Sequence, residues 1–275
     1  MTEQPAPLAQ LIHHLHAQGR LRVWSVIVTI LGELAEPEGG ELSMSALLDL
    51  CAALEIEPQA VRTAMSRLSK EALVTGRRLG RQAFYRFSNA GLAQYHRAAR
   101  RIYAAPRDIE HWRYGLIGPD ADLAQMQKDC AAESPLILGA RLACWPAAAM
   151  PEGLKPWRAG FVEFDSPPLT FPNWARAQVF PVLNAESCGL IAHLCGALDG
   201  QVLKAPQAQL TRLLLVHFWR RLVLRYPTIE APLDDWPLAL AHRALANLYP
   251  QLVQMSDGAP GCASRFRMLP NIIDL

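Results

Sequence analysis

Six polar side chains share one face of a predicted helix at residues 58–72, and each of them can bind nucleic acid. They are Gln59, Arg62, Thr63, Ser66, Arg67 and Lys70. At about 100° per residue these positions lie opposite an apolar face made of Val61, Ala64, Met65 and Leu68. Arginine can bond a guanine edge in two places, glutamine can bond an adenine edge, and hydroxyls can serve bases or phosphates. We interpret this polar face, which carries no acid, as a DNA-reading surface.

The charge of the surrounding segment supports this interpretation over an ordinary solvated face, which would mix Glu with its Lys and Arg. Residues 56–103 contain ten Lys or Arg and two Asp or Glu, a net charge of +8. Because the whole chain has a net charge of +2, the remainder carries −6. A basic block in an otherwise acidic chain indicates a polyanionic partner.

The elements around this helix predict how it is positioned. Residues 22–34 have apolar side chains at helical spacing, Ser43 is a good N-cap for a second helix that ends near Leu54, and Pro58 suits a first helical turn. Strand-like runs at 73–77 and 83–87 follow, with Gly80 suited to the turn between them. Helix, turn, helix and hairpin form the plan of a winged helix-turn-helix. Three basic residues at the hairpin are predicted to reach phosphates or the minor groove: Arg77, Arg78 and Arg81.

Several of these motifs resemble the PaaX-type repressor family, which is named for the control of phenylacetate catabolism. The most specific is Val61-Arg-Thr-Ala-Met-Ser-Arg-Leu68, supported by Ser25-Val-Ile-Val-Thr-Ile-Leu-Gly32 and Gly76-Arg-Arg-Leu-Gly-Arg81. A second block agrees near the other end of the chain, at residues 212–221, 225–227 and 233–237.

The resemblance implies an α+β, multi-domain protein. An N-terminal winged helix-turn-helix at 1–104 would precede a central ferredoxin-like (Cas2-like) α/β domain at 105–183 and a helical C-terminal domain at 184–275. It also implies a homodimer that represses transcription on double-stranded operator DNA. Such a repressor would release the DNA when an aryl-acetyl-CoA effector, phenylacetyl-CoA in the namesake, binds to it.

The rest of the chain can be interpreted beside that expectation. Strands are predicted at 112–117, 135–145, 160–164 and 177–181, and helices at 120–133, 187–198, 209–224 and 238–253. The β-α-β-β order of the middle part is compatible with a ferredoxin-like domain. The numerous prolines between residues 146 and 172 predict long rigid loops there.

One further set of residues is a candidate effector site. His217, Arg221 and Arg225 recur every four residues on the predicted helix 209–224. Guanidinium groups suit phosphate oxygens, so the set could bind the phosphates of coenzyme A. An ion-paired or dimer-facing stripe is the alternative interpretation.

Enzymatic and metal chemistry are not expected. No nucleotide-binding, nucleophile-elbow or zinc-protease motif occurs, and the six cysteines form no C-x-x-C pair. No cofactor is predicted beyond the acyl-CoA effector. The chain starts without a secretory pattern, and its apolar runs are shorter than the ~20 residues of a membrane helix, so a cytoplasmic protein without membrane contact is expected.

Two other functions are compatible with the sequence. The winged helix could contact proteins instead of DNA, with the C-terminal part acting as a scaffold. The middle domain could process nucleic acid with a metal, since Asp120 and Asp122 follow its first strand, although both also suit a helix N-terminus.

Overall fold

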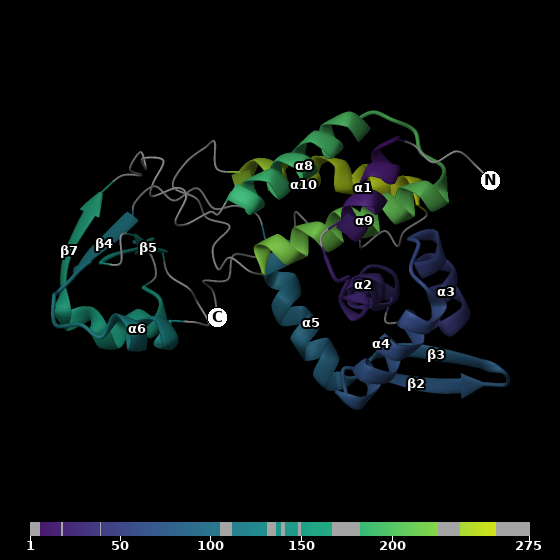
Figure 1. The fold of residues 1–275 in the computed structure, drawn as a ribbon, viewed down its shortest axis with the longest axis horizontal. Helices are drawn as coiled ribbons and strands as arrows, with labels where there is room; N and C mark the ends of the chain where they lie inside the picture. The colour runs from purple at the N-terminus through teal and green to yellow at the C-terminus, as the bar shows by residue number, and fades with distance from the viewer. Residues whose placement is uncertain are drawn as a thin grey trace. The chain divides into compact units, whose positions relative to one another are not determined.

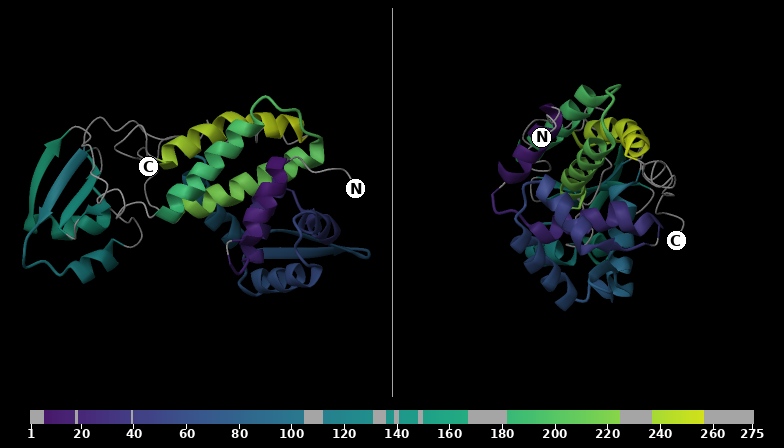
Figure 2. Two further views of the ribbon diagram at one scale, coloured as in Figure 1. Left: turned by 45° about the horizontal axis from the view of Figure 1, so that its top comes forward. Right: turned by 90° about the vertical axis from the view of Figure 1, so that its right-hand side faces the viewer.

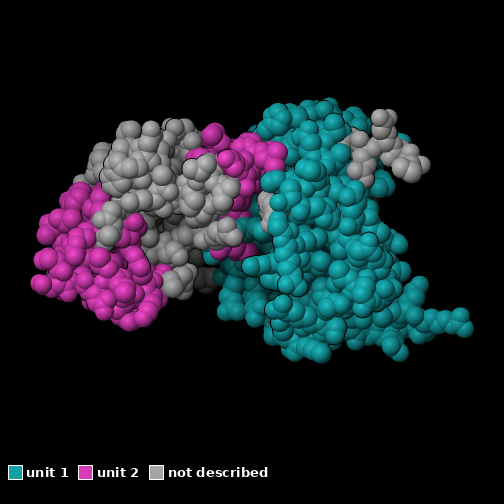
Figure 3. All heavy atoms as spheres, viewed as in Figure 1, with its two compact units in different colours: residues 1–105, 193–221, 244–275 teal, residues 106–192, 222–243 magenta. Residues whose placement is uncertain are grey.

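The chain combines helices with two small antiparallel sheets, which makes it an α+β protein as the sequence predicts (Figure 1). The computed structural model describes residues 6–17, 19–38, 40–104, 112–130, 136–138, 141–147, 150–166, 182–224 and 237–256. The chain divides into two compact units (Figure 3). Unit 1 comprises Met1–Ala105, His193–Arg221 and Ala244–Leu275, and unit 2 comprises Pro106–Ala192 and Leu222–Arg243. The division into three domains remains a prediction.

The helical part of unit 1 is built around α9 (Ala205–Val223), in which every residue from 210 to 219 is buried. This explains its nearly continuous apolar sequence. α1 (Ala6–Ala17), which the sequence patterns did not predict, and α2 (Val23–Ile30) both lie beside α9 (Figures 1 and 2). The α1 contact includes the ring of His14, whose centroid lies 5.0 Å from that of Phe218.

The predicted helix at 22–34 changes character near its end. The α-helical part, α2, ends at Ile30. It is followed directly by a π-helical turn, η1 (Leu31–Ala35), and a short 3-10 turn, η2 (Glu36–Glu38). Glu33 in this turn is 2% exposed. Its carboxylate accepts a hydrogen bond from the Tyr103 hydroxyl and one of 2.9 Å from Tyr249 Oη in α10 (Pro237–Met255). Arg212 Nε lies 3.6 Å from Glu33 Oε2, so the buried carboxylate has a cation beside it.

The remainder of unit 1 contains the predicted helix pair and hairpin. α3 (Met44–Ala53) is capped by Ser43, whose hydroxyl accepts a 3.1 Å bond from the Ala46 amide, as predicted. α4 (Pro58–Lys70) packs on α2 and α3. The three-stranded sheet has the order β1-β3-β2, and its strands are β1 (Leu42–Ser43), β2 (Val74–Leu79) and β3 (Gln82–Phe87).

α5 (Asn89–Ile102) follows the hairpin and begins at an N-cap formed by Ser88. The Ser88 hydroxyl accepts a bond of 3.0 Å from the Gly91 amide and donates one of 2.5 Å to the Ala72 carbonyl. A Cβ atom on Gly91 would lie 1.9 Å from the Leu73 carbonyl oxygen, so only glycine permits this approach. The start of α5 is therefore packed directly against the segment that joins α4 to β2.

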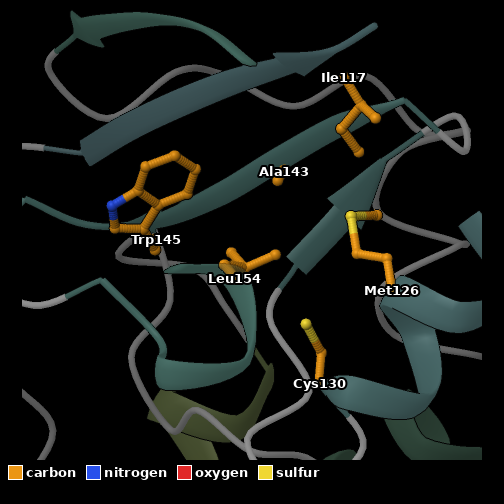
Figure 4. Close-up of a cluster of buried hydrophobic side chains, with 6 residues drawn as sticks. All are labelled: Ile117, Met126, Cys130, Ala143, Trp145 and Leu154. Atoms are coloured by element: carbon orange, nitrogen blue, oxygen red, sulfur yellow. The ribbon is translucent and has the colours of Figure 1, made fainter. Parts of the chain in front are cut away.

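Unit 2 contains a four-stranded antiparallel sheet of order β5-β6-β4-β7. Along the chain its elements are β4 (Trp112–Ile117), α6 (Leu123–Asp129), β5 (Leu136–Leu138), β6 (Leu142–Pro146), η3 (Glu152–Gly160) and β7 (Phe161–Ser166). Its core gathers Trp145, Ile117 and Ala143 of the sheet with Met126 and Leu154 (Figure 4).

Two expectations for this unit are wrong. The predicted single strand at 135–145 is two strands, because β5 pairs antiparallel with β6 and Leu138 lies opposite Leu142. Pro156, predicted to lie in a rigid loop, lies inside the 3-10 helix η3, where the pyrrolidine ring suits the required φ. The predicted strand at 177–181 lies outside the described residues.

α8 (Val182–Leu198) is the first of the three long helices of the C-terminal part, which the sequence predicts within a few residues of their bounds. Among the helices that the structure describes, none has the length and apolarity needed to cross a bilayer.

Candidate nucleic-acid interface

The face of α4 that points away from the core is polar, as its sequence periodicity predicts. Val61, Ala64, Met65 and Leu68 are buried, and Pro58 occupies the first turn, where its missing N–H costs no hydrogen bond. The six polar residues at 59, 62, 63, 66, 67 and 70 are all exposed. Together they form one continuous, open surface. The structure therefore brings all six predicted side chains to one accessible surface.

An acid, Glu71, reaches this surface, although the predicted face contained none. Glu71, the C-cap residue of α4, accepts a 2.7 Å hydrogen bond at Oε1 from Arg67 Nε. The pair forms because residues four apart lie on the same side of a helix. Both side chains are exposed, at 63% and 45%, and such exposed pairs contribute only about 0.2–1 kcal/mol. A phosphate or base edge can therefore replace Glu71 as the partner of Arg67 at little cost.

The hairpin β2–β3 extends beside α4 and protrudes from unit 1 (Figures 1 and 3). Leu79 pairs with Gln82, so the two-residue turn consists of Gly80 and Arg81. Gly80 has φ +61°, the left-handed conformation that glycine adopts without strain. This confirms its predicted place in the turn.

The three predicted arginines of the hairpin differ in their partners. Arg77 Nε donates a 2.6 Å bond to Glu41 Oε2, and its guanidinium carbon lies 5.4 Å from the centre of the Phe84 ring. Within the part of the chain that the structure describes, Arg78 and Arg81 have no ion-pair partner, and both are exposed. Arg78 and Arg81 are thus available to an external anion, whereas Arg77 stabilises the hairpin.

Two residues at this surface were missed from the sequence. Arg86 Nε lies 4.0 Å from Glu41 Oε1, so Glu41 is shared by cations on both strands of the hairpin. Leu79, at the end of β2, is 63% exposed, an unusual position for a large apolar side chain. Apolar residues beside basic ones can insert into the minor groove. The sequence could have indicated the exposure of Leu79, because this residue lies between Arg78 and Gly80 at the predicted turn.

The predicted effector residues do not form a surface cluster over the described part of the chain. His217 is 2% exposed and its Nδ1 lies 3.1 Å from Thr29 Oγ1. Burial first, and then the nearby charges of Arg220 and Arg221, together lower the pKa of His217 to about 3. Arg221 is exposed, and Arg225 lies outside the described residues. An effector role for the three remains a prediction.

The cysteines that the structure describes are inert, apolar core residues. All five that the structure describes are buried, and burial raises the pKa of Cys51, Cys144, Cys188 and Cys195 to about 12. Such thiols stay protonated at neutral pH and behave as small apolar side chains. Among the described residues, no three His, Cys, Asp or Glu side chains are grouped closely enough to hold a metal ion.

A helix–turn–helix pair with an exposed basic face, followed by a basic hairpin, is an arrangement suited to the surface of a nucleic acid. Residues 22–91, which contain all of these elements, match the family model described as PaaX-like protein. The chain is also 27% identical to the transcriptional repressor PaaX of Escherichia coli (strain K12) over 254 residues, covering 82% of this chain and 78% of that protein. These matches confirm the resemblance to the PaaX-type family.

A solved structure of an uncharacterized protein from Mycobacterium tuberculosis is also similar. It is 17% identical in sequence with a TM-score of 0.45, over 85% of this chain and 96% of that one.

Proposed function

We propose that this chain is a transcriptional repressor that binds operator DNA through a winged helix-turn-helix formed by α3, α4 and the hairpin β2–β3. The observation that carries the proposal is the exposure of Gln59, Arg62, Thr63, Ser66, Arg67 and Lys70 on one side of α4, opposite a buried apolar face. The similarity to a transcriptional repressor over most of both chains supports it.

The two elements would have different tasks on DNA. α4 has the size of a recognition helix, and its side chains Arg62, Thr63, Ser66 and Arg67 would contact bases or their flanking phosphates in the major groove. Arg78 and Arg81 would reach phosphates or the adjacent minor groove from the hairpin. Lys70 would add a salt-sensitive phosphate contact.

Regulation is the second part of the proposal. A homodimer would place two copies of α4 on one face of the duplex, and an aryl-acetyl-CoA effector would favour a dimer geometry that no longer matches the operator. This requires the effector to bind the two geometries with different affinities. The resemblance to the PaaX-type family supports an acyl-CoA effector, and the control of phenylacetate or related aromatic-acid catabolism follows from the same resemblance.

The decisive experiment selects the operator from a random duplex library with the wild-type protein and then measures the affinity of single variants for it. Arg62→Ala and Arg67→Ala should each lose specific affinity by about 1–3 kcal/mol if they bond a guanine, with unchanged circular dichroism. Arg20→Ala, which removes an exposed arginine outside α4 and the hairpin, is the matched control.

Three results would contradict the proposal. The library could yield no preferred sequence, the two α4 variants could retain wild-type affinity, or DNA binding could be absent at every salt concentration. The last result would favour a protein-interaction scaffold, because a phosphate-binding surface must lose affinity as salt rises.

A further inference from the structure

Unit 1 contains a partly open cavity of about 170 Å³ between α2, η1, α5 and α9. Most of its wall is apolar or aromatic, including Trp24, Phe87, Tyr95 and Tyr103. An engineered apolar cavity of roughly 150 Å³ is large enough to bind benzene. The size and the aromatic lining therefore suit a single aromatic ring.

Arg220 of α9 is the only basic residue among those that line this cavity. Its Nη1 donates hydrogen bonds to the Ser25 carbonyl, at 2.8 Å, and to Thr29 Oγ1, at 3.0 Å. A guanidinium has five N–H donors, and the described residues provide no other partner for them. In particular, no carboxylate of the described residues lies within ion-pair distance of Arg220.

Glu33 also lines the cavity, but its carboxylate is already bound. It accepts hydrogen bonds from Tyr103 and Tyr249, and Arg212 Nε lies 3.6 Å away. Arg212 therefore balances the charge of Glu33, and the charge of Arg220 stays unbalanced. Burial is the main cause that lowers the pKa of Arg220, although arginine remains charged at neutral pH.

A partly buried cation without an anion is costly, and an anion placed beside it recovers free energy. Carboxylates suit this position because their two oxygens match the paired donors of a guanidinium. We propose that the cavity binds a small aromatic carboxylate, with its ring among the aromatic side chains and its carboxylate on Arg220.

The position of the cavity connects it to the proposed DNA-binding surface. Leu73 directly precedes β2 and Phe87 ends β3, and both line the cavity. The π-helical turn η1 contributes Gly32 and Glu33 to the wall, and such turns are frequent at functional sites. A bound ligand would therefore contact the base of the hairpin. This regulatory consequence rests on the proposed function, whereas ligand binding itself does not.

The free acid should bind better than its coenzyme A thioester. A thioester lacks the negative charge that Arg220 would recognise, and the coenzyme is far larger than the cavity. The ligand of this cavity is thus chemically distinct from an acyl-CoA effector.

Isothermal titration calorimetry on the full-length protein without DNA tests the proposal. The probes are benzoate and phenylacetate, the neutral controls are benzamide and phenylacetamide, and acetate and phenylacetyl-CoA complete the series. At least one aromatic carboxylate should bind about tenfold tighter than its amide, which corresponds to about 1.4 kcal/mol. Neither acetate nor phenylacetyl-CoA should compete with the aromatic carboxylate for the cavity.

Two variants locate the site. Arg220→Gln should weaken carboxylate binding at least about tenfold, and Ala98→Phe should abolish it by filling the cavity while the charge of Arg220 is retained. Arg20→Gln is the matched control and should bind as the wild type does. Circular dichroism checks that each variant folds. Because the two variants change different parts of the site, either one suffices if the other unfolds.

The proposal is overturned if neither aromatic carboxylate binds the wild-type protein, if acid and amide bind equally, or if Ala98→Phe and Arg220→Gln bind as the wild type does. A DNA titration of the same preparation keeps the two proposals separate. Operator binding without carboxylate binding would overturn only the cavity proposal, and carboxylate binding without DNA binding would overturn only the repressor.

Discussion

The exposed basic residues of the candidate interface differ in whether they form an ion pair with an acidic side chain. Arg67 forms an ion pair with Glu71, and Arg77 forms one with Glu41. The described residues provide no acidic partner for Arg62, Arg78 or Arg81. Exposed ion pairs are weak, so DNA phosphates can displace Glu71. The same acid also repels a polyanion. Glu71 is therefore expected to reduce affinity for DNA of any sequence.

Glu71→Gln should accordingly raise the affinity for non-specific duplex several-fold, because one repulsive charge is lost and Arg67 is released. The gain should shrink as the salt concentration rises from about 50 mM to about 200 mM. Fluorescence anisotropy with a labelled duplex measures both effects. Glu186→Gln, which removes an exposed acid of α8, should leave the affinity unchanged, and equal behaviour of the two variants would refute the assigned role of Glu71.

A second prediction at this scale concerns pH. The pKa of His217 is about 3 in the folded chain, against about 6.5 in an unfolded one. Between these values the unfolded chain binds a proton at this position and the folded chain does not. The free energy of unfolding should therefore decrease as the pH falls from about 6.5 toward 3, with a limiting contribution of about 1.4 kcal/mol per pH unit.

Chemical denaturation followed by tryptophan fluorescence, repeated from about pH 7 to about pH 4, measures this dependence. His217→Gln should flatten the curve because glutamine does not titrate, and it can still bond Thr29. His193→Gln, at an exposed histidine, should not flatten it. A wild-type slope that survives in His217→Gln would show that other groups cause the acid sensitivity.

The elements of the candidate interface are held in place by their neighbours along the chain. The Ser88 amide donates a 3.1 Å bond to the Leu73 carbonyl, and the Ser88 side chain caps α5 while it bonds Ala72. The junction from α4 to β2 is thus attached to the start of α5. This arrangement leaves no room for a side chain at Gly91.

Gly91→Ala should therefore destabilise unit 1 by at least about 1–3 kcal/mol, the usual cost of forcing extra atoms into a packed site, since the backbone of Leu73 must move. Gly189→Ala in α8 is the matched control, because a Cβ there meets nothing within 4 Å. It should be neutral or stabilise the helix by up to about 1 kcal/mol. Thermal unfolding compares the two, and similar melting temperatures would contradict the assigned packing.

The distribution of charge distinguishes the proposed DNA-binding surface from the rest of the molecule. The basic residues of segment 56–103 lie on α4, the hairpin and α5 of unit 1, while the remaining chain is acidic. A polyanion is attracted to the basic segment and repelled by the acidic remainder, so the protein should bind a duplex in a single orientation. A dimer would present two such surfaces.

If the proposed repressor is a dimer, its operator should be an inverted repeat, and the spacing of the half-sites should matter more than the sequence between them. Insertion of about five base pairs rotates one half-site to the opposite face of the duplex and should abolish cooperative binding. Insertion of about ten base pairs restores the face and should recover part of it. Gel shifts with the three duplexes test this, and indifference to spacing would favour monomers on separate sites.

Local periodicity explains how much of the fold could be predicted. The apolar face of α4, the cap at Ser43 and the turn at Gly80 depend on residues within a few positions of one another, and the structure confirms all three. The hairpin of β5 and β6 was predicted as one strand, although Gly139 and Arg141 interrupt the apolar run between Leu138 and Leu142 and could have indicated the reversal. α1 was missed because its burial depends on α9, about two hundred residues away.

The residue types and spacings by themselves determined which side chains α4 turns outward, because a helix orients its residues by position alone. Tertiary structure decided which charges have partners. Glu41 reaches Arg77 across 36 positions, and Arg220 meets Ser25 across 195. The cavity beside Arg220 is equally a product of packing, since α2, α5 and α9 each contribute only part of its wall and no sequence pattern records the space between helices.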